Sequence, residues 1–118
     1  MTIAPVAVIL LSTTDNPEDA DRLAAALIEQ RLAACVQIDG PIRSHYRWQG
    51  KIESANEWRL MVKTTVEMAA AAESALLQLH PYDEPEILLL PVTAGSPAYL
   101  SWLAAEVGPG DASSAEDR

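Results

Sequence analysis

The sequence contains no phenylalanine and a single cysteine among its 118 residues. A core must therefore come from Leu, Ile, Val and Ala, and with 49% hydrophobic residues the chain can bury one. Cys35 cannot form an internal disulfide, so the fold does not depend on an oxidising compartment. The apolar stretch before Ser12 is too short to span a bilayer and lacks the basic flank of a signal peptide. We expect a cytoplasmic protein without a membrane partner.

Basic residues are scarce too. Eight Lys and Arg face 17 Asp and Glu, which gives a formal net charge of −9 and a pI near 4.5. Such a surface repels phosphate backbones, so nucleic-acid binding is excluded as a leading hypothesis. It is compatible with attracting cations, although most acidic domains are simply well solvated. Gly-rich phosphate loops, CxxC pairs and HExxH helices are absent, and no nucleophile with a nearby base is visible, so neither an enzyme nor an organic cofactor is indicated.

A long β-hairpin is predicted between Val36 and Thr64. Polar and apolar residues alternate with a period of two on both sides of Gln49-Gly50, a short turn sequence. We expect each set of alternating residues to share one face. The apolar set of the first arm is Val36, Ile38, Ile42, Tyr46 and Trp48, and that of the second arm is Ile52, Trp58, Leu60 and Val62.

The length of this hairpin predicts an oligomer. An arm of about fourteen residues spans near 45 Å at roughly 3.3 Å per residue, whereas a compact chain of this size has a radius of gyration of about 13 Å. Gly40-Pro41 should bend the first arm and shorten it somewhat. Tyr46 and Trp48 should still project past their own domain, where large aromatics need a partner surface. We expect a homo-oligomer in which each subunit supplies a ribbon to its neighbour.

The remaining segments predict an α+β fold. Two continuously apolar stretches indicate strands that are covered on both faces. They are Val6–Leu11 and Ile87–Leu90, the second of which lies within the predicted strand 86–91. Residues 12–15 are predicted as a turn. Asn16-Pro17 starts a helix that ends near Arg31 and buries one apolar stripe. A second helix, capped by Thr64 or Thr65, spans residues 66–79 before His80-Pro81, and Gly95-Ser96-Pro97 starts a last one. The stripe of the first helix is Ala20, Leu23, Ala24, Leu27 and Ile28.

This order, strand-helix-strand-strand-helix-strand plus a C-terminal helix, is the pattern of the ferredoxin-like fold. In that fold an antiparallel sheet carries its helices on one face. The other face would be bare in a monomer, which is a second reason to expect assembly. Residues 1–107 are predicted to form one domain, and residues 108–118 a disordered tail without apolar anchors.

Candidate metal ligands lie near the end of the second helix. His80 either interacts with the helix dipole or serves as a metal ligand or proton carrier. Asp83, Glu84 and Glu86 follow in a loop stiffened by two prolines, and a nearby imidazole and carboxylates could take a divalent cation. Cys35 is either a buried inert thiol or a further ligand.

Aromatic residues are the other candidates for a site. Tyr46, Trp48 and Trp58 are predicted to line a ligand cleft or to pack against a neighbouring subunit. Tyr82 and Trp102 are placed in the same cleft or interface set.

Several motifs in this order resemble the CutA divalent-cation tolerance proteins, over about Val6 to Val107. They are Ala33-Ala34-Cys35-Val36, Tyr46-x-Trp48-x-Gly50-Lys51-Ile52, Lys63-Thr64, His80-Pro81-Tyr82, Pro85-Glu86-Ile87 and Tyr99-Leu100-x-Trp102. The resemblance implies a ferredoxin-like homotrimer built through exchanged hairpins, similar in architecture to the PII signalling proteins.

The resemblance also implies a role in tolerance of copper and other divalent metals, with copper or zinc as the expected ions. Copper-binding members are described as using a cysteine after the first strand and histidines after the second helix. Those positions hold Ser12, Leu79 and His80 here, so only His80 matches. We therefore expect a metal or small-ligand site between subunits with His80, Cys35 and Glu86 as ligands. A PII-like signalling or scaffold trimer and a small enzyme remain alternatives.

Overall fold

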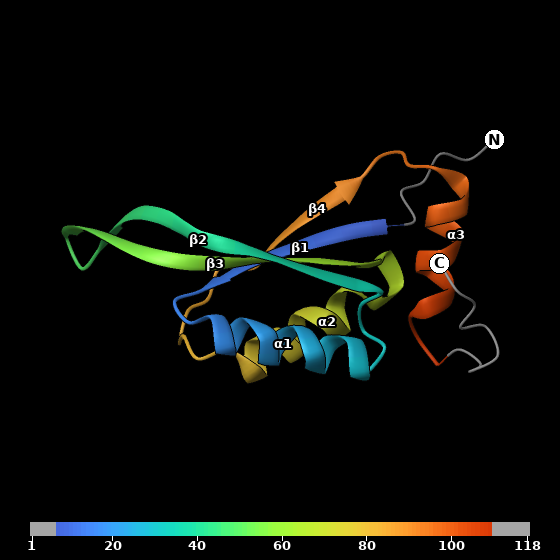
Figure 1. Cartoon of the computed structure of the whole chain (residues 1–118), viewed down its shortest axis with the longest axis horizontal. Coiled ribbons are helices and arrows are strands. Elements are labelled where there is room, and N and C mark those ends of the chain that lie inside the picture. Colours follow the sequence, from blue (N-terminus) through green and yellow to red (C-terminus); the bar gives the residue numbers. More distant parts are fainter. Residues whose placement is uncertain (1–6, 110–118) are drawn as a thin grey trace.

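The computed structural model describes residues 7–109, which form a four-stranded sheet and three helices (Figure 1). Most of the predicted tail, residues 110–118, lies outside the described residues. The elements in chain order are β1 (Ala7–Thr14), α1 (Pro17–Glu29), β2 (Cys35–Trp48), β3 (Lys51–Thr65), α2 (Val66–Leu79), β4 (Leu88–Val92) and α3 (Pro97–Glu106).

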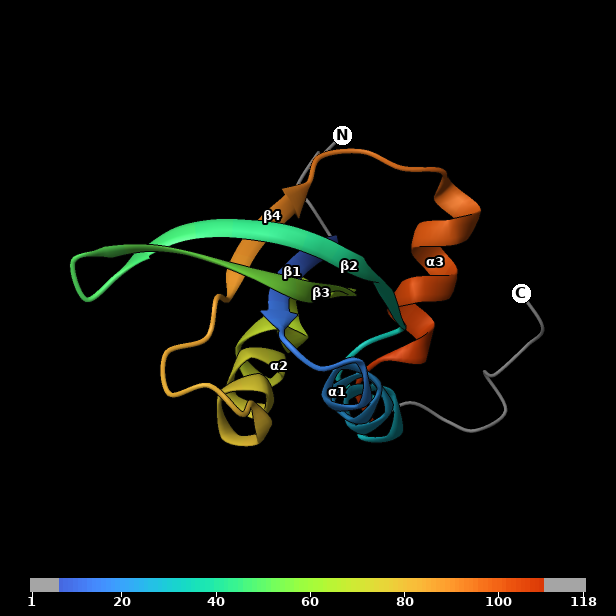
Figure 2. The same ribbon diagram turned by 60° about the vertical axis from the view of Figure 1, so that its left-hand side comes forward.

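The sheet has the order β2-β3-β1-β4, and every neighbouring pair is antiparallel. α1 and α2 lie side by side against one face of the sheet, whereas α3 stands at the end remote from the hairpin tip (Figures 1 and 2). The predicted α+β class and the predicted element order are confirmed. No helix within residues 7–109 combines the length and apolarity needed to cross a bilayer.

The hydrophobic core lies between the sheet and the first two helices. Alternate residues of β1 and β3 point toward α1 and α2, because side chains along a strand alternate between its faces. The largest fully buried core side chains are Leu10, Leu23, Leu27, Leu60, Leu76 and Val62. Ile28 at the end of the predicted α1 stripe instead remains 43% exposed.

The helix boundaries follow the predicted capping signals closely. The Asn16 side chain accepts hydrogen bonds from the backbone N–H groups of Glu18 and Asp19, and Pro17 begins α1. Thr65 caps α2 through Met68 N–H. In contrast, the predicted turn over residues 12–15 is wrong, because β1 continues to Thr14, which pairs with Trp58 of β3.

β4 differs most from its prediction. It begins at Leu88 and lies at the edge of the sheet, not in its interior. Leu88, Leu89 and Leu90 are 55%, 51% and 43% exposed in the single chain. An apolar run indicates that a strand is covered, but it does not say whether the cover comes from the same chain. The prediction of burial on both faces therefore fails within one subunit.

The hairpin is as long as predicted. β2 has 14 residues and β3 has 15, joined by Gln49-Gly50, which have the positive φ angles (49° and 79°) of a tight hairpin turn. The described chain measures 49 × 30 × 22 Å, and its radius of gyration is 15.4 Å. This exceeds the roughly 13 Å of a compact chain of this length, because the hairpin tip projects beyond the body (Figure 1).

A β-bulge at Gly40-Pro41 changes the face of the sheet to which the later side chains of β2 point. Asp39 pairs with Arg59 but Ile42 pairs with Glu57, so β2 carries one residue more than β3 between these pairs. Such an extra residue moves every later side chain to the opposite face. The predicted single apolar face of β2 is therefore wrong. Val36 and Ile38 face the helices, whereas Ile42, Ser44, Tyr46 and Trp48 face the other side.

Gly40 is required at this bulge because Trp58 packs against its backbone. A Cβ atom at Gly40 would lie 2.5 Å from Trp58 Cδ1. We predict that Gly40→Ala lowers the free energy of unfolding by about 1–3 kcal/mol, measured by urea denaturation, since overpacking forces neighbouring groups to shift. The control is Gly50→Asn, at a left-handed turn position with no neighbouring atom within 4 Å. Asn tolerates this conformation, so its cost should stay below about 0.5 kcal/mol. Equal losses in the two variants would contradict this packing argument.

Candidate functional site

A broad groove lies between the hairpin and the loop that follows α2. Its volume is about 1080 Å³. One wall comes from the hairpin and the other from residues 82–86, with the end of β1 between them. The lining residues used below are Thr13, Asp15, Ser44, Tyr46, Trp48, Glu57, Tyr82, Asp83, Glu84 and Glu86.

The groove brings together four of the predicted site residues. Tyr46 and Trp48 line its hairpin wall and are 45% and 52% exposed. Tyr82 and Glu86 line the opposite wall. The bulge in β2 makes this possible, because it turns Tyr46 and Trp48 to the face that also carries Glu57.

The groove is strongly acidic. Asp83, Glu84 and Glu86 line it, as the sequence suggested for one loop, and Asp15 and Glu57 join them from the end of β1 and from β3. Sequence reasoning missed the last two as site residues. The pairing of β1 with β3 places Glu57 at the site. Thr14, the last residue of β1, pairs with Trp58, and Glu57 directly precedes Trp58, so Glu57 lies beside the end of β1.

His80 is buried and holds the loop through two backbone hydrogen bonds. Its Nε2 lies 2.8 Å from the carbonyl oxygen of Thr13, and its Nδ1 accepts from the backbone N–H of Tyr82 at 3.0 Å. A carbonyl only accepts, so Nε2 carries the proton and the ring is neutral. Both ring nitrogens are therefore occupied by the protein backbone, and the side chain is only 8% exposed.

Tyr82 connects this loop to the sheet. Its hydroxyl donates to Glu57 Oε2 at 2.9 Å, and its ring lies 4.9 Å from the ring of His80. Glu57 is 8% exposed, so the phenol supplies a hydrogen bond to a carboxylate that burial would otherwise destabilise. Burial and then the neighbouring Glu57 raise the pKa of Tyr82 well above its usual value, so the hydroxyl stays a donor. The groove wall is thus fixed to β1 and β3.

Comparison with known proteins identifies the family. The family model described as CutA1 divalent ion tolerance protein matches residues 8–106. This chain belongs to the CutA1 family. The divalent-cation tolerance protein CutA of Pectobacterium atrosepticum is 44% identical over 101 residues, which is 86% of this chain and 92% of that protein. The one from Thermus thermophilus is 42% identical over 100 residues, 85% of this chain and 97% of that protein.

Solved structures of CutA proteins share the fold. Cut A1 from Thermus thermophilus matches with a TM-score of 0.84 at 41% identity, covering 86% of this chain and 99% of that one. CutA1 from Oryza sativa matches with a TM-score of 0.86 at 33% identity, covering 92% of this chain and 100% of that one. CutA from Archaeoglobus fulgidus, described as periplasmic, matches with a TM-score of 0.79 at 37% identity, covering 82% and 94%. The resemblance inferred from the ordered motifs is confirmed.

Four predicted site residues of this CutA chain do not line the groove: His80, whose hydrogen bonds are given above, and Cys35, Trp58 and Trp102. Cys35 begins β2 and pairs with Lys63, near the end of the sheet that α3 covers. Trp58 faces the helices and packs against the core. Trp102 lies on α3 with its ring 5.5 Å from that of Tyr99.

The predicted metal ligands do not form one cluster within a single chain. Residues 7–109 contain no group of three or more His, Cys, Asp or Glu side chains placed to hold one ion. Cys35 lies opposite Lys63 on β3, whereas His80 contacts Thr13 near the other end of β1, and both His80 nitrogens already have partners. Within one chain these side chains do not fit a copper or zinc site.

The buried His80 predicts a pH-dependent stability. Burial is the largest influence on its pKa, and it lowers the pKa below the usual value of about 6.5. The folded state thus takes up this proton at lower pH than the unfolded chain does. The contribution to stability is present above about pH 6.5 and is lost as pH falls through the lowered pKa.

We predict that urea denaturation between pH 7.5 and 5 shows wild-type stability falling more steeply than that of His80→Asn, since the variant removes this proton uptake. Gln78→Asn, at an exposed position of α2, is the control and should keep the wild-type slope. Parallel curves for wild type and His80→Asn would contradict the role assigned to His80.

Proposed function

We propose that this CutA protein acts in divalent-cation tolerance as a cytoplasmic homotrimer of ferredoxin-like subunits. In this proposal the acidic groove binds a divalent cation, copper or zinc in the first place, once a neighbouring chain completes it. The groove carries the proposal, because it joins carboxylates to an exposed hairpin tip. Residues 7–109 of one chain do not supply a full ligand set for an ion. The lone Cys35, which needs no oxidising compartment, supports the cytoplasmic location.

The exposed apolar surface supports assembly. Leu88 and Leu90 pair with Leu11 and Ile9, so they lie on the sheet face opposite α1 and α2. Both are about half exposed, as are the aromatic side chains of the hairpin tip. Exposed apolar surface of this kind is typical of protein–protein interfaces, and an edge strand such as β4 can pair with a strand of another chain. A second copy that supplies its hairpin would cover both.

The composition of the groove supports cation binding. The exposed carboxylates of Asp15, Asp83, Glu84 and Glu86 lie along it and attract positive charge. Since they form no complete ligand set in one chain, we propose that the ion is held between chains. Carboxylate oxygens are ligands for zinc and for harder divalent ions. His80 acts in this proposal by positioning the loop, not by binding the ion.

A second candidate function is a PII-like signalling or scaffold trimer. Tyr46 and Trp48, exposed at the hairpin tip, favour it, because aromatic side chains are enriched where proteins bind other proteins. A small enzyme with a site between subunits has less support. Among the described groove residues, the hydrogen bond that joins a hydroxyl to a possible base is that of Tyr82 to Glu57, and it fixes the loop to the sheet.

We predict that light scattering at micromolar concentration reports a trimer, and that Leu88→Glu with Leu90→Glu converts it to a monomer. Two carboxylates would be buried without partners in the interface, which is costly. The control is Leu77→Glu on α2, which is 52% exposed on the outer helix surface, and it should remain a trimer. A stable wild-type monomer would refute the assembly.

We predict that calorimetric titration with Zn²⁺ and Cu²⁺ shows binding that Glu84→Gln with Glu86→Gln weakens by at least about tenfold. Even indirect partners of metal ligands change affinity about 10–100-fold when removed. The control is Glu73→Gln, on the exposed side of α2. Identical isotherms for wild type and the double variant would rule out the groove carboxylates, and binding lost in His80→Asn alone would place the ion on the imidazole.

A further inference from the structure

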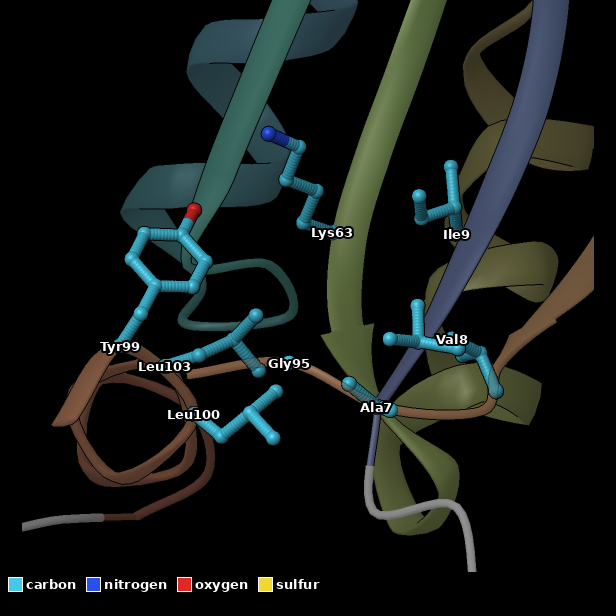
Figure 3. A pocket seen from close by; sticks show the side chains of 10 residues that line it. Ala7, Val8, Ile9, Lys63, Gly95, Tyr99, Leu100 and Leu103 are labelled. Carbon is cyan, nitrogen blue, oxygen red and sulfur yellow. The ribbon is translucent and has the colours of Figure 1, made fainter. Parts of the chain in front are cut away.

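A cavity of about 230 Å³ lies between α3 and the start of β1 (Figure 3). Ile9 and Lys63 line it, and both lie on the sheet face opposite α1 and α2, because they pair with each other and alternate with the buried Leu10 and Val62. A neighbouring chain in the proposed assembly would cover this face, so the open cavity in one chain does not indicate a ligand. The bulge of β2 carries a different chemical feature, which does not depend on a free surface.

The bulge contains Asp39-Gly40, which is the one Asp-Gly pair of the chain, and the sequence has no Asn-Gly pair. An aspartate before a glycine can react with its own main chain, because glycine has no Cβ to shield its amide nitrogen. The Gly40 nitrogen attacks Cγ of Asp39, and the carboxyl hydroxyl leaves as water together with the amide proton. The product is a five-membered succinimide ring. The reaction is intramolecular and needs no ligand.

Water then opens the ring in one of two ways. If water adds at Cγ, the bond from Cγ to the Gly40 nitrogen breaks and aspartate is restored. If water adds at the main-chain carbonyl carbon of residue 39, the bond from that carbon to the nitrogen breaks. The product is then isoaspartate, in which the main chain runs through Cβ and Cγ and is longer by one atom.

The pairing of β2 with β3 is interrupted at this point. Asp39 pairs with Arg59, but the ladder resumes only where Ile42 pairs with Glu57, so Gly40 has no paired residue on β3. A bulge of this kind leaves its extra residue outside the ladder that restrains the rest of the strand. The one reactive dipeptide of the chain therefore lies where pairing of the backbone restrains it least.

Two consecutive residues of β3 hold the reacting groups instead. Arg59 Nε and Nη2 donate to Asp39 Oδ1 and Oδ2 at 3.2 and 2.8 Å, and a two-point contact of this kind fixes the plane of a carboxylate. Trp58 packs against Gly40, where a Cβ atom would lie 2.5 Å from Trp58 Cδ1. The carboxyl group must turn away from Arg59 before its Cγ can meet the Gly40 nitrogen, and this turn breaks both hydrogen bonds.

We propose that Asp39 is a site of isoaspartate formation in this protein and that Arg59 suppresses the reaction. The two side chains are 50% and 41% exposed, and exposed ion pairs contribute little to stability, so stability alone assigns this pair only a small role. Isoaspartate would add its extra main-chain atom at the bulge, which sets the face to which the later side chains of β2 point. The outer half of the hairpin would then lose its register with β3.

Incubation of the folded protein in water labelled with the heavy isotope of oxygen tests the proposal. Each opening of the ring leaves one labelled oxygen atom in residue 39, and trypsin releases that residue in the peptide 32–43. Arg59→Gln should label this peptide at least about threefold faster than wild type, the factor that corresponds to an exposed ion pair. Arg22→Gln, which breaks the ion pair with Asp19, is the matched control and should keep the wild-type rate. Equal rates in wild type and Arg59→Gln, including no labelling in either, would overturn the proposal.

The chemistry is checked in the Arg59→Gln background. A methyltransferase specific for isoaspartate should methylate the labelled peptide. Adding Asp39→Glu should abolish both the label and the methylation, because glutamate would have to close a six-membered ring, which forms far more slowly. Label that persists in this double variant would not come from a succinimide at residue 39 and would overturn the proposal.

A variant with a weakened core separates local protection from global unfolding. Val8→Ala removes two methyl groups from a side chain that is 4% exposed, so it lowers the free energy of unfolding but leaves the contact of Arg59 with Asp39 in place. It should label the peptide at the wild-type rate. A rise as large as that in Arg59→Gln would show that unfolding of the whole chain controls the reaction, and it would overturn the role of Arg59.

Discussion

One extra residue in β2 determines how this molecule presents its functional surface. Before the bulge at Gly40-Pro41, β2 places Val36 and Ile38 on the core, where they pair with Val62 and Leu60. After it, the same alternation turns Tyr46 and Trp48 to the opposite face. The hairpin can therefore contribute apolar side chains to the core along one half and aromatic side chains to the groove along the other. A strand without the bulge would place both sets on the helix side, and the groove would lose its aromatic wall.

The loop after α2 depends on the core in a different way. β4 pairs with β1 only as far as Leu11, whereas β1 continues to Thr14. The backbone groups of the last residues of β1 therefore have no partner in β4. His80 uses one of them, the carbonyl of Thr13, and orders the following residues through Tyr82. Because both of its nitrogens bond to backbone, a change of side chain at position 80 acts on the position of the loop and not on a ligand directly. The His80 imidazole thus connects the end of α2, the end of β1 and the loop that forms one wall of the groove.

Much of the fold could be predicted from the sequence, because its signals are local. Asn16-Pro17, Thr65 and His80-Pro81 set helix boundaries that depend only on nearby backbone groups. The change of side-chain facing at Gly40-Pro41 in β2 could not be predicted from the alternation of polar and apolar residues alone. A bulge is recognised only when the pairing of the two strands is known. The exposure of Leu88 to Leu90 was missed for a related reason, because an apolar run does not specify which chain covers it.

The site was predicted less completely than the fold. Tyr46, Trp48, Tyr82 and Glu86 line one groove, although the sequence assigns Glu86 to a metal set with His80 and Cys35 and the aromatic residues to a separate cleft or interface set. Cys35 and His80 were grouped by chemistry, and only the register shows that they belong to different ends of the sheet. Which side chains converge is a property of strand pairing over long sequence separations, and composition carries no information about it.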